Sequence, residues 1–137
     1  MNTNQCDIGL IGLGVMGENL VLNMESKGFS VAVFNRTTEV TEKFAAGRAQ
    51  GKNIRPTLTL EEFVGALNKP RIAMMMVKAG QPVDSAIGQL APLLEKGDVI
   101  IDGGNALVTD TQRRERELES TGIHFVGRGI RRRGRRA

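Results

Sequence analysis

The sequence predicts an α/β fold built around a doubly wound, mainly parallel sheet. Short apolar runs alternate with amphipathic segments along the chain, which is the pattern of successive βαβ units. A glycine-rich turn, residues 12–17, stands between the first apolar run and the first amphipathic segment. The run 72–77 is apolar throughout, as expected for a parallel strand that is covered on both faces.

In the first half of the chain we expect two strands, each followed by a helix. Buried strands account for the two short apolar runs, and Gly28 is expected to end the first helix as its C′ residue. Residues 47–56 are rich in Gly, Lys and Arg and are predicted to form a loop. The expected elements are strand 8–11, helix 16–27, strand 31–34 and helix 38–46.

The second half repeats the alternation. Thr59 and Glu62 have the spacing of a capping box, and Thr109 and Gln112 have the same spacing, so each pair is expected to open a helix. The segment 102–105, Asp-Gly-Gly-Asn, is expected to end a strand in a turn. The expected elements are helix 59–67, strand 72–77, helix 82–94, strand 99–101, helix 109–120 and strand 124–126.

Composition and charge exclude several classes of protein. The chain has 137 residues, enough for one domain, and 40% hydrophobic with 25% charged residues is ordinary for a soluble globular protein. No apolar run is long enough to span a membrane, and no signal peptide is evident. The single cysteine, Cys6, cannot form an internal disulfide, which favours a reducing cytoplasm; we expect it to be a small buried hydrophobe.

The formal net charge of +4 comes from the end of the chain. Six arginines lie in the last ten residues, and the rest of the chain is mildly acidic. Tryptophan and tyrosine are absent, so little aromatic surface is offered for stacking on bases. Binding of nucleic acid by the folded body is therefore not expected.

The turn of residues 12–17 reads G-x-G-x-x-G and lies between a predicted strand and a predicted helix. In a Rossmann-like fold Gly12 would permit the tight turn and Gly14 the approach of a pyrophosphate, while Gly17 would let the helix pack on the strand. The helix N-terminus adds unpaired N–H groups and the positive end of its dipole. We therefore expect a dinucleotide to bind here.

The end of the second predicted strand indicates which dinucleotide. NAD-binding domains usually place an acid here, whereas this chain has Asn35, Arg36 and Thr37. Asn35 removes the negative charge that would repel a 2′-phosphate, Arg36 offers a planar fork of donors, and Thr37 offers a hydroxyl. These residues favour NADP, and they disfavour S-adenosylmethionine.

Two further strand ends are expected at the same edge of the sheet. Lys78, with Val77 and Ala79, follows one strand, and Asn105 closes the segment after another. Lys78 would bring positive charge to the cofactor, and Asn105 can donate and accept hydrogen bonds near a nicotinamide or a sugar. We expect Asp102 to order the turn rather than to act as a base.

Other conspicuous residues have simpler explanations. The side chains of the run 74–76, three methionines, should point to alternate faces of a strand, which favours core packing over a metal site. His124 has no His or Cys at ligand spacing, so a structural role is expected. No metal is expected.

Several motifs together resemble the N-terminal domain of the decarboxylating 6-phosphogluconate dehydrogenases. They are Gly-Leu-Gly-Val-Met-Gly-Glu-Asn-Leu, Phe-Asn-Arg-Thr, Met-Val-Lys-Ala-Gly, Asp-Gly-Gly-Asn, Asp-Thr-Gln-Arg-Arg and Gly-Ile-His-Phe-Val-Gly, between residues 12 and 127. The related β-hydroxyacid dehydrogenases share the first motif and often the Asn-Arg pair. They usually lack the Val-Lys-Ala-Gly motif.

The resemblance implies an NADP-dependent oxidoreductase of the pentose phosphate pathway and of gluconate utilization, acting without a metal. It converts 6-phosphogluconate by oxidative decarboxylation to ribulose 5-phosphate, as a cytoplasmic homodimer. The implied substrate-binding residue is Asn105. The implied cofactor-binding residues are Gly12, Leu13, Gly14, Val15, Met16, Gly17, Asn35, Arg36, Thr37, Val77, Lys78, Ala79 and Asn105.

The chain departs from the family pattern at two places. Ala106 stands where the family usually has Ser or Thr. From residue 130 the chain carries a basic tail instead of Val-Ser-Gly-Gly-Glu-Glu-Gly-Ala, and the catalytic Lys and Glu of the family and its dimerising domain lie further on. We therefore expect a Rossmann domain over 1–129 and a tail over 130–137, produced by a frame slip, in a truncated chain that is inactive alone.

Alternative functions remain open at this point. The chain could be a non-catalytic NADP-binding module, or a fragment of a related β-hydroxyacid dehydrogenase. The tail could also be an arm that binds nucleic acid or a membrane surface. For the dehydrogenase domain that the resemblance implies, we expect neither a nucleic-acid partner nor a membrane partner.

Overall fold

The computed structural model describes residues 5–78 and 80–130, with only the backbone for 105–108 and 128–130. Strands and helices alternate from the first strand to the last, as the apolar runs predict. The elements are β1 Ile8–Ile11, α1 Val15–Ser26, β2 Val31–Phe34, α2 Thr38–Ala46, β3 Ile54–Pro56, α3 Leu60–Gly65, β4 Ile72–Met75, α4 Gln81–Leu90, a 3₁₀ turn Ala91–Leu93, β5 Val99–Leu107, α5 Val108–Glu119 and β6 His124–Ile130.

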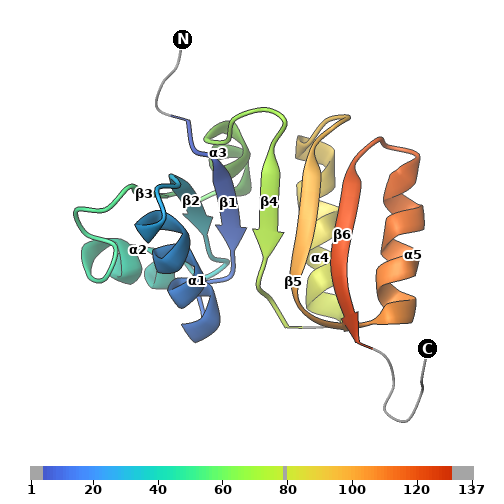
Figure 1. The fold of residues 1–137 in the computed structure, drawn as a ribbon, viewed down its shortest axis with the longest axis horizontal. Coiled ribbons are helices and arrows are strands. Elements are labelled where there is room, and N and C mark those ends of the chain that lie inside the picture. The colour runs from blue at the N-terminus through green and yellow to red at the C-terminus, as the bar shows by residue number, and fades with distance from the viewer. Residues whose placement is uncertain (1–4, 79, 131–137) are drawn as a thin grey trace.

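The strands form one six-stranded sheet in the order β3-β2-β1-β4-β5-β6, and every pair is parallel. This order is that of the doubly wound dinucleotide-binding fold, so the predicted Rossmann-like class is confirmed. In Figure 1, α1 lies in front of the sheet, whereas α3 and α4 lie behind it. The winding reverses between β1 and β4, where such folds bind their ligands.

The core is divided by the sheet into two apolar clusters. Leu10 of β1 packs with Val21 of α1 and Phe44 of α2, whereas the next residue, Ile11, packs on the other face with Phe63 of α3. Successive strand residues point to opposite faces, which explains the division. The predicted burial of the single cysteine is also confirmed, since Cys6 is 4% exposed.

The methionine run follows the same alternation. Met75 is fully buried with the α3 side of the core, and Met74 and Met76 pack against the other cluster. The predicted core packing is therefore confirmed. Among the described residues no group of His, Cys, Asp and Glu could hold a metal ion.

The predicted loop 47–56 is wrong at its end, because Ile54–Pro56 forms the edge strand β3 beside β2. Its three residues are too few to show a periodic pattern, and the Lys and Arg around them resemble a loop. The glycine at the end of α1 behaves as predicted: Gly28 has a φ of 101° at the C′ position.

The segment 102–105 is not the turn that its two glycines suggest. Strand β5 continues through it to Leu107, and pairing with β6 resumes at Ala106 after a register shift. Helix α5 accordingly begins at Val108, so Thr109 lies inside the helix rather than before it. By contrast, Thr59 caps α3 as predicted, since its hydroxyl accepts the N–H of Glu62 at 3.0 Å. The Glu62 side chain accepts the N–H of Leu58 at 2.8 Å, one residue before the N-cap.

Helix 82–94 was predicted as one element, but it is α4 followed by a 3₁₀ turn that contains Pro92. Proline has no N–H to donate and crowds the preceding turn, which explains the change. No helix of the described residues is long and apolar enough to cross a membrane.

Candidate functional site

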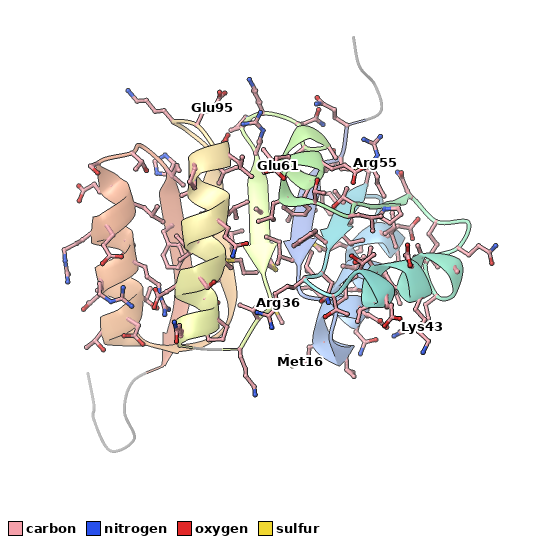
Figure 2. All side chains as sticks on the ribbon, turned by 180° about the vertical axis from the view of Figure 1, so that it is seen from behind. Met16, Arg36, Lys43, Arg55, Glu61 and Glu95 are labelled. Carbon is pink, nitrogen blue, oxygen red and sulfur yellow. The ribbon has the colours of Figure 1, made fainter. Side chains whose placement is uncertain are left out.

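A cavity of about 350 Å³ opens where β1, β2 and β4 end, beside α4; we call it the strand-end cavity. Figure 2 shows Arg36 at this end of the sheet and Glu61 and Glu95 at the opposite end. The cavity lies where the winding of the sheet reverses, which is where this fold class binds ligands. The cavity is lined by Ile11, Gly12, Gly14, Phe34, Asn35, Arg36, Thr37, Leu60, Met76, Val77, Lys78, Pro82, Ser85, Ala86 and Gln89.

The glycine turn is tightly built around two positions that exclude a side chain. Gly12 has a φ of 104°, its N–H donates to the Phe34 carbonyl at 2.9 Å, and a Cβ there would overlap the Met76 carbonyl. A Cβ on Gly17 would overlap the carbonyl of Gly12 itself. The first turn of α1 therefore lies directly on the end of β1, as the motif predicts.

Gly14 has the opposite surroundings. It is the N-cap of α1, and an added Cβ would meet nothing within 4 Å. Helix geometry leaves the first N–H groups of α1 without intrahelical acceptors, and the positive end of its dipole lies at the same place. This open backbone is suited to an anion such as a pyrophosphate.

Asn35 supports the turn, a role that sequence reasoning missed. Its Oδ1 accepts the N–H of Leu13 at 2.7 Å, and its Nδ2 donates to the carbonyl of Thr37 at 3.4 Å. An aspartate could accept the same bond from Leu13, so the hydrogen bond alone does not explain an amide at this position. The absence of charge on Asn35 is what distinguishes it from the acid of NAD-binding domains.

The charge of the cavity is positive. Arg36 and Lys78 both line it and are exposed, and none of its described lining residues is Asp or Glu. Thr37 also lines the cavity, and its side chain makes no capping bond to α2. Two cations without a competing carboxylate favour an anionic ligand.

The structure brings seven of the expected residues together around the cavity: Gly12, Gly14, Asn35, Arg36, Thr37, Val77 and Lys78. Leu13 and Gly17 are buried, and the Leu13 N–H already donates to Asn35. Ala79 lies outside the described residues, as do residues 131–137 of the expected tail 130–137. Asn105 is in β5, but its side chain is outside the described part of the structure.

Val15 and Met16 lie on the first turn of α1 and are 77% and 70% exposed. Met16 lines a second, apolar groove of about 740 Å³ with Met74, Met76 and Val126, which we call the methionine groove. Met76 also lines the strand-end cavity, so the two spaces adjoin. A ligand that leaves the cavity past Met76 would meet this apolar surface.

Sequence reasoning also missed the wall of the cavity that α4 supplies. Pro82, Ser85, Ala86 and Gln89 line it at the spacing of one helix face. Since a helix after β4 was expected, that spacing could have identified them. The first turn of α4 is anchored by Asp84, and a hydrogen bond from Arg114 holds the pKa of this carboxyl below its ordinary value of 3.8.

Comparison with known proteins agrees with this geometry. Residues 7–134 match the family described as the NAD binding domain of 6-phosphogluconate dehydrogenase. The decarboxylating 6-phosphogluconate dehydrogenase of Synechococcus elongatus is 61% identical over 122 residues, which are 89% of this chain and 26% of the relative. The NADP(+)-dependent, decarboxylating enzyme of Bacillus subtilis is 54% identical over 123 residues, 90% of this chain and 26% of the relative.

Solved structures give the same result. Plasmodium falciparum 6-phosphogluconate dehydrogenase, described with its cofactor NADP+ and its substrate 6-phosphogluconate, matches with a TM-score of 0.80 and 42% identity over 88% of this chain and 26% of its own. Mycobacterium tuberculosis 3-hydroxyisobutyrate dehydrogenase has a TM-score of 0.75 at 20% identity, covering 92% of this chain and 40% of its own, and shares the fold. The chain thus spans about a quarter of the length of its curated relatives.

Proposed function

Because this chain belongs to the family of the NAD binding domain of 6-phosphogluconate dehydrogenase, we propose that it binds NADP in the strand-end cavity. One observation carries the choice of NADP over NAD. Arg36, Thr37 and Lys78 line a cavity without a described carboxylate, at the strand end where NAD-binding domains use an acid for the ribose hydroxyls. The added 2′-phosphate of NADP gains from the Arg36 cation and meets no carboxylate among the described lining residues.

The proposed pose follows from the backbone. The pyrophosphate lies over Gly12 and Gly14 at the N-terminus of α1, where a side chain would obstruct it. Arg36 and Thr37 hold the 2′-phosphate, Arg36 through its planar fork of N–H donors. The remaining proposed contacts are Leu13, Val15, Met16, Gly17 and Asn35 around the turn, Val77, Lys78 and Ala79 after β4, and Asn105 in β5.

The curated relatives extend well beyond the quarter of their length that this chain matches. For a full-length protein of this family we propose the oxidative decarboxylation of 6-phosphogluconate to ribulose 5-phosphate, with Asn105 also contacting the sugar. When bound, NADP+ supplies the acceptor for the hydride that leaves C3, and the resulting keto acid loses carbon dioxide. The described residues are suited to binding the cofactor. Among those that line the cavity, Lys78 is the candidate for acid-base chemistry, and its place in the cavity wall favours contact with the cofactor. We place the acid-base pair for this reaction outside residues 5–130.

We further propose that the full-length protein acts in the cytoplasm and forms a homodimer. The buried thiol of Cys6, whose pKa burial raises, is compatible with a reducing compartment. Cell fractionation with an antibody against this domain would test the location, and sedimentation of the full-length protein would test the dimer.

Replacing Arg36 with alanine tests the proposed cofactor. We expect Arg36→Ala to weaken NADP binding at least tenfold, since loss of a charge-assisted contact costs about 1.5–3 kcal/mol, and to leave NAD binding unchanged. Titration calorimetry with both cofactors gives the two dissociation constants. The purified 137-residue chain is the sample.

Lys43→Ala is the matched control, because Lys43 is an exposed cation on α2 that does not line the cavity. Figure 2 shows it on a different part of the surface from Arg36. We expect both dissociation constants to stay at their original values in this variant. Equal weakening of NADP and NAD by Arg36→Ala would contradict the proposed 2′-phosphate contact.

A further inference from the structure

Arg114 on α5 is a buried arginine outside the strand-end cavity. Its side chain is 1% exposed. Nε donates to Oδ1 of Asp84 at 2.8 Å, and Nη2 donates to the Gly80 carbonyl at 3.1 Å and to Oδ2 of Asp84 at 3.3 Å. A buried charge is costly even when it is paired, and apolar residues often replace such pairs without loss of stability. Stability alone therefore does not explain a buried arginine at this position.

The two acceptors belong to one structural feature, the start of α4. Gly80 is the N-cap of this helix, with a φ of 95°, and Asp84 lies in its first turn. Pro82 and Ser85, between and beside them, line the strand-end cavity. Arg114 thus holds the start of α4, which forms part of the cavity wall, through residues that do not themselves line the cavity.

The guanidinium also faces the neighbouring strand. Its Nη1 lies 3.9 Å from Oδ2 of Asp102, which is 1% exposed. The other carboxylate oxygen of Asp102 accepts the N–H of Gly104 at 3.0 Å. Gly104 in turn lies close to the end of β4, because an added Cβ would be 3.1 Å from the Val77 carbonyl.

We propose that Arg114 is a positioning residue for the cofactor: it holds the start of α4 and the Asp102–Gly104 segment in fixed relation, so that the wall formed by Val77, Lys78 and Pro82 fits the ligand. This inference rests on the proposed binding of NADP. Arg114 itself does not line the strand-end cavity. Since it acts on the shared wall rather than on the 2′-phosphate contact, its loss should weaken NADP and NAD by the same factor.

Arg113 supplies the matched control. It also donates to Asp84, at 3.0 and 3.2 Å, but its side chain is 40% exposed. Among the described residues it donates to Asp84 and Glu117, and to neither Gly80 nor Asp102. A variant at Arg113 therefore removes a bond to the same carboxylate without disturbing the bridge between α4 and β5.

The experiment compares Arg114→Lys with Arg113→Lys in the 137-residue chain. Lysine keeps the charge but cannot reach Asp84 and Gly80 together with a planar fork. We expect Arg114→Lys to raise the dissociation constants of NADP and NAD by at least fivefold each, measured by calorimetry. We also expect it to shift the amide NMR signals of Lys78 and Gly104 in the ligand-free protein, and Arg113→Lys to change neither.

Urea unfolding of the same samples separates positioning from stability. Unchanged dissociation constants in folded Arg114→Lys would overturn the proposal, whatever happens to its unfolding midpoint. If Arg114→Lys does not fold, the double variant Arg114→Met with Asp102→Asn removes both buried charges and retains the Asn oxygen for Gly104. Original affinities in that variant would likewise overturn the proposal, and a fivefold loss would support it. Failure of the proposed function would instead appear as no NADP binding by the unaltered chain.

Discussion

Replacing Gly17 with alanine is expected to abolish detectable NADP binding and to lower the free energy of unfolding. The new methyl group would overlap the carbonyl of Gly12, a backbone atom of the turn that is itself held at a φ of 104°. Overpacking against rigid neighbours costs about 1–3 kcal/mol. Relief of the overlap requires α1 to move away from β1, which removes its N-terminus from the pyrophosphate.

This result runs against simple helix propensity. Gly17 lies in α1, where alanine is intrinsically better than glycine by about 1 kcal/mol. Gly88→Ala in α4 is the control, since Gly88 is exposed and its added Cβ meets nothing within 4 Å. We expect it to raise the free energy of unfolding and to leave NADP binding unchanged.

Gly14→Ala separates binding from folding at the same turn. Gly14 has a φ of −76° and open space around it, so alanine fits the free protein without strain. The methyl group would nevertheless occupy the side from which the pyrophosphate approaches. Calorimetry and urea unfolding should show clearly weaker NADP binding with only a small loss of stability, below about 1 kcal/mol, because alanine is a poorer N-cap than glycine. For Gly17→Ala, original stability and original NADP affinity would contradict the effect expected from the close packing of the turn.

Local signals in the sequence were sufficient for the first βαβ unit. The strand of residues 8–11, the glycine turn and the strand 31–34 each have a short-range cause, and the structure has them as expected. The end of β5 could not be predicted in this way. Gly103 and Gly104 resemble a turn, but pairing with β6, more than twenty residues away, continues the strand beyond them.

In the candidate site, too, local patterns could be predicted and long-range contacts could not. The cavity residues that follow strands were predicted because parallel strands end at one edge of a sheet. Interactions between distant polar residues were not. The bond from Leu13 to Asn35 and that from Arg114 to Asp84 join residues 22 and 30 positions apart, and nothing in the spacing of the sequence marks them as partners.

The largest effect on stability is expected at the opposite end of the sheet, for Asp98→Asn. Asp98 is 1% exposed, and its carboxylate accepts the N–H of Arg71 at 2.8 Å, the N–H of Glu95 at 2.9 Å and the Arg71 guanidinium at 3.1 Å. Asparagine keeps one oxygen as an acceptor but turns Nδ2, a donor, toward the remaining N–H groups. The guanidinium of Arg71, which is only 15% exposed, would then lose its counter-ion. Breaking a buried pair costs about 3–5 kcal/mol.

The pH dependence gives this prediction its sign. Burial would raise the pKa of Asp98, but the hydrogen bonds from Glu95 and Arg71 outweigh it and hold the pKa below the ordinary value of 3.8. The folded state thus gains stability from the ionised carboxylate above the unfolded-state pKa, and loses it as the pH falls through the lower, folded-state pKa. Urea unfolding at pH 7 and pH 3 should show a large difference between Asp98→Asn and the original chain at pH 7, and a smaller one at pH 3.

Glu95→Gln is the control, because its ion pair with Lys69 is exposed and worth less than about 1 kcal/mol. NADP affinity should be unchanged in folded Asp98→Asn, since Asp98 does not line the cavity; a midpoint equal to that of the original chain at pH 7 would show that the Arg71 pair does not stabilise the fold.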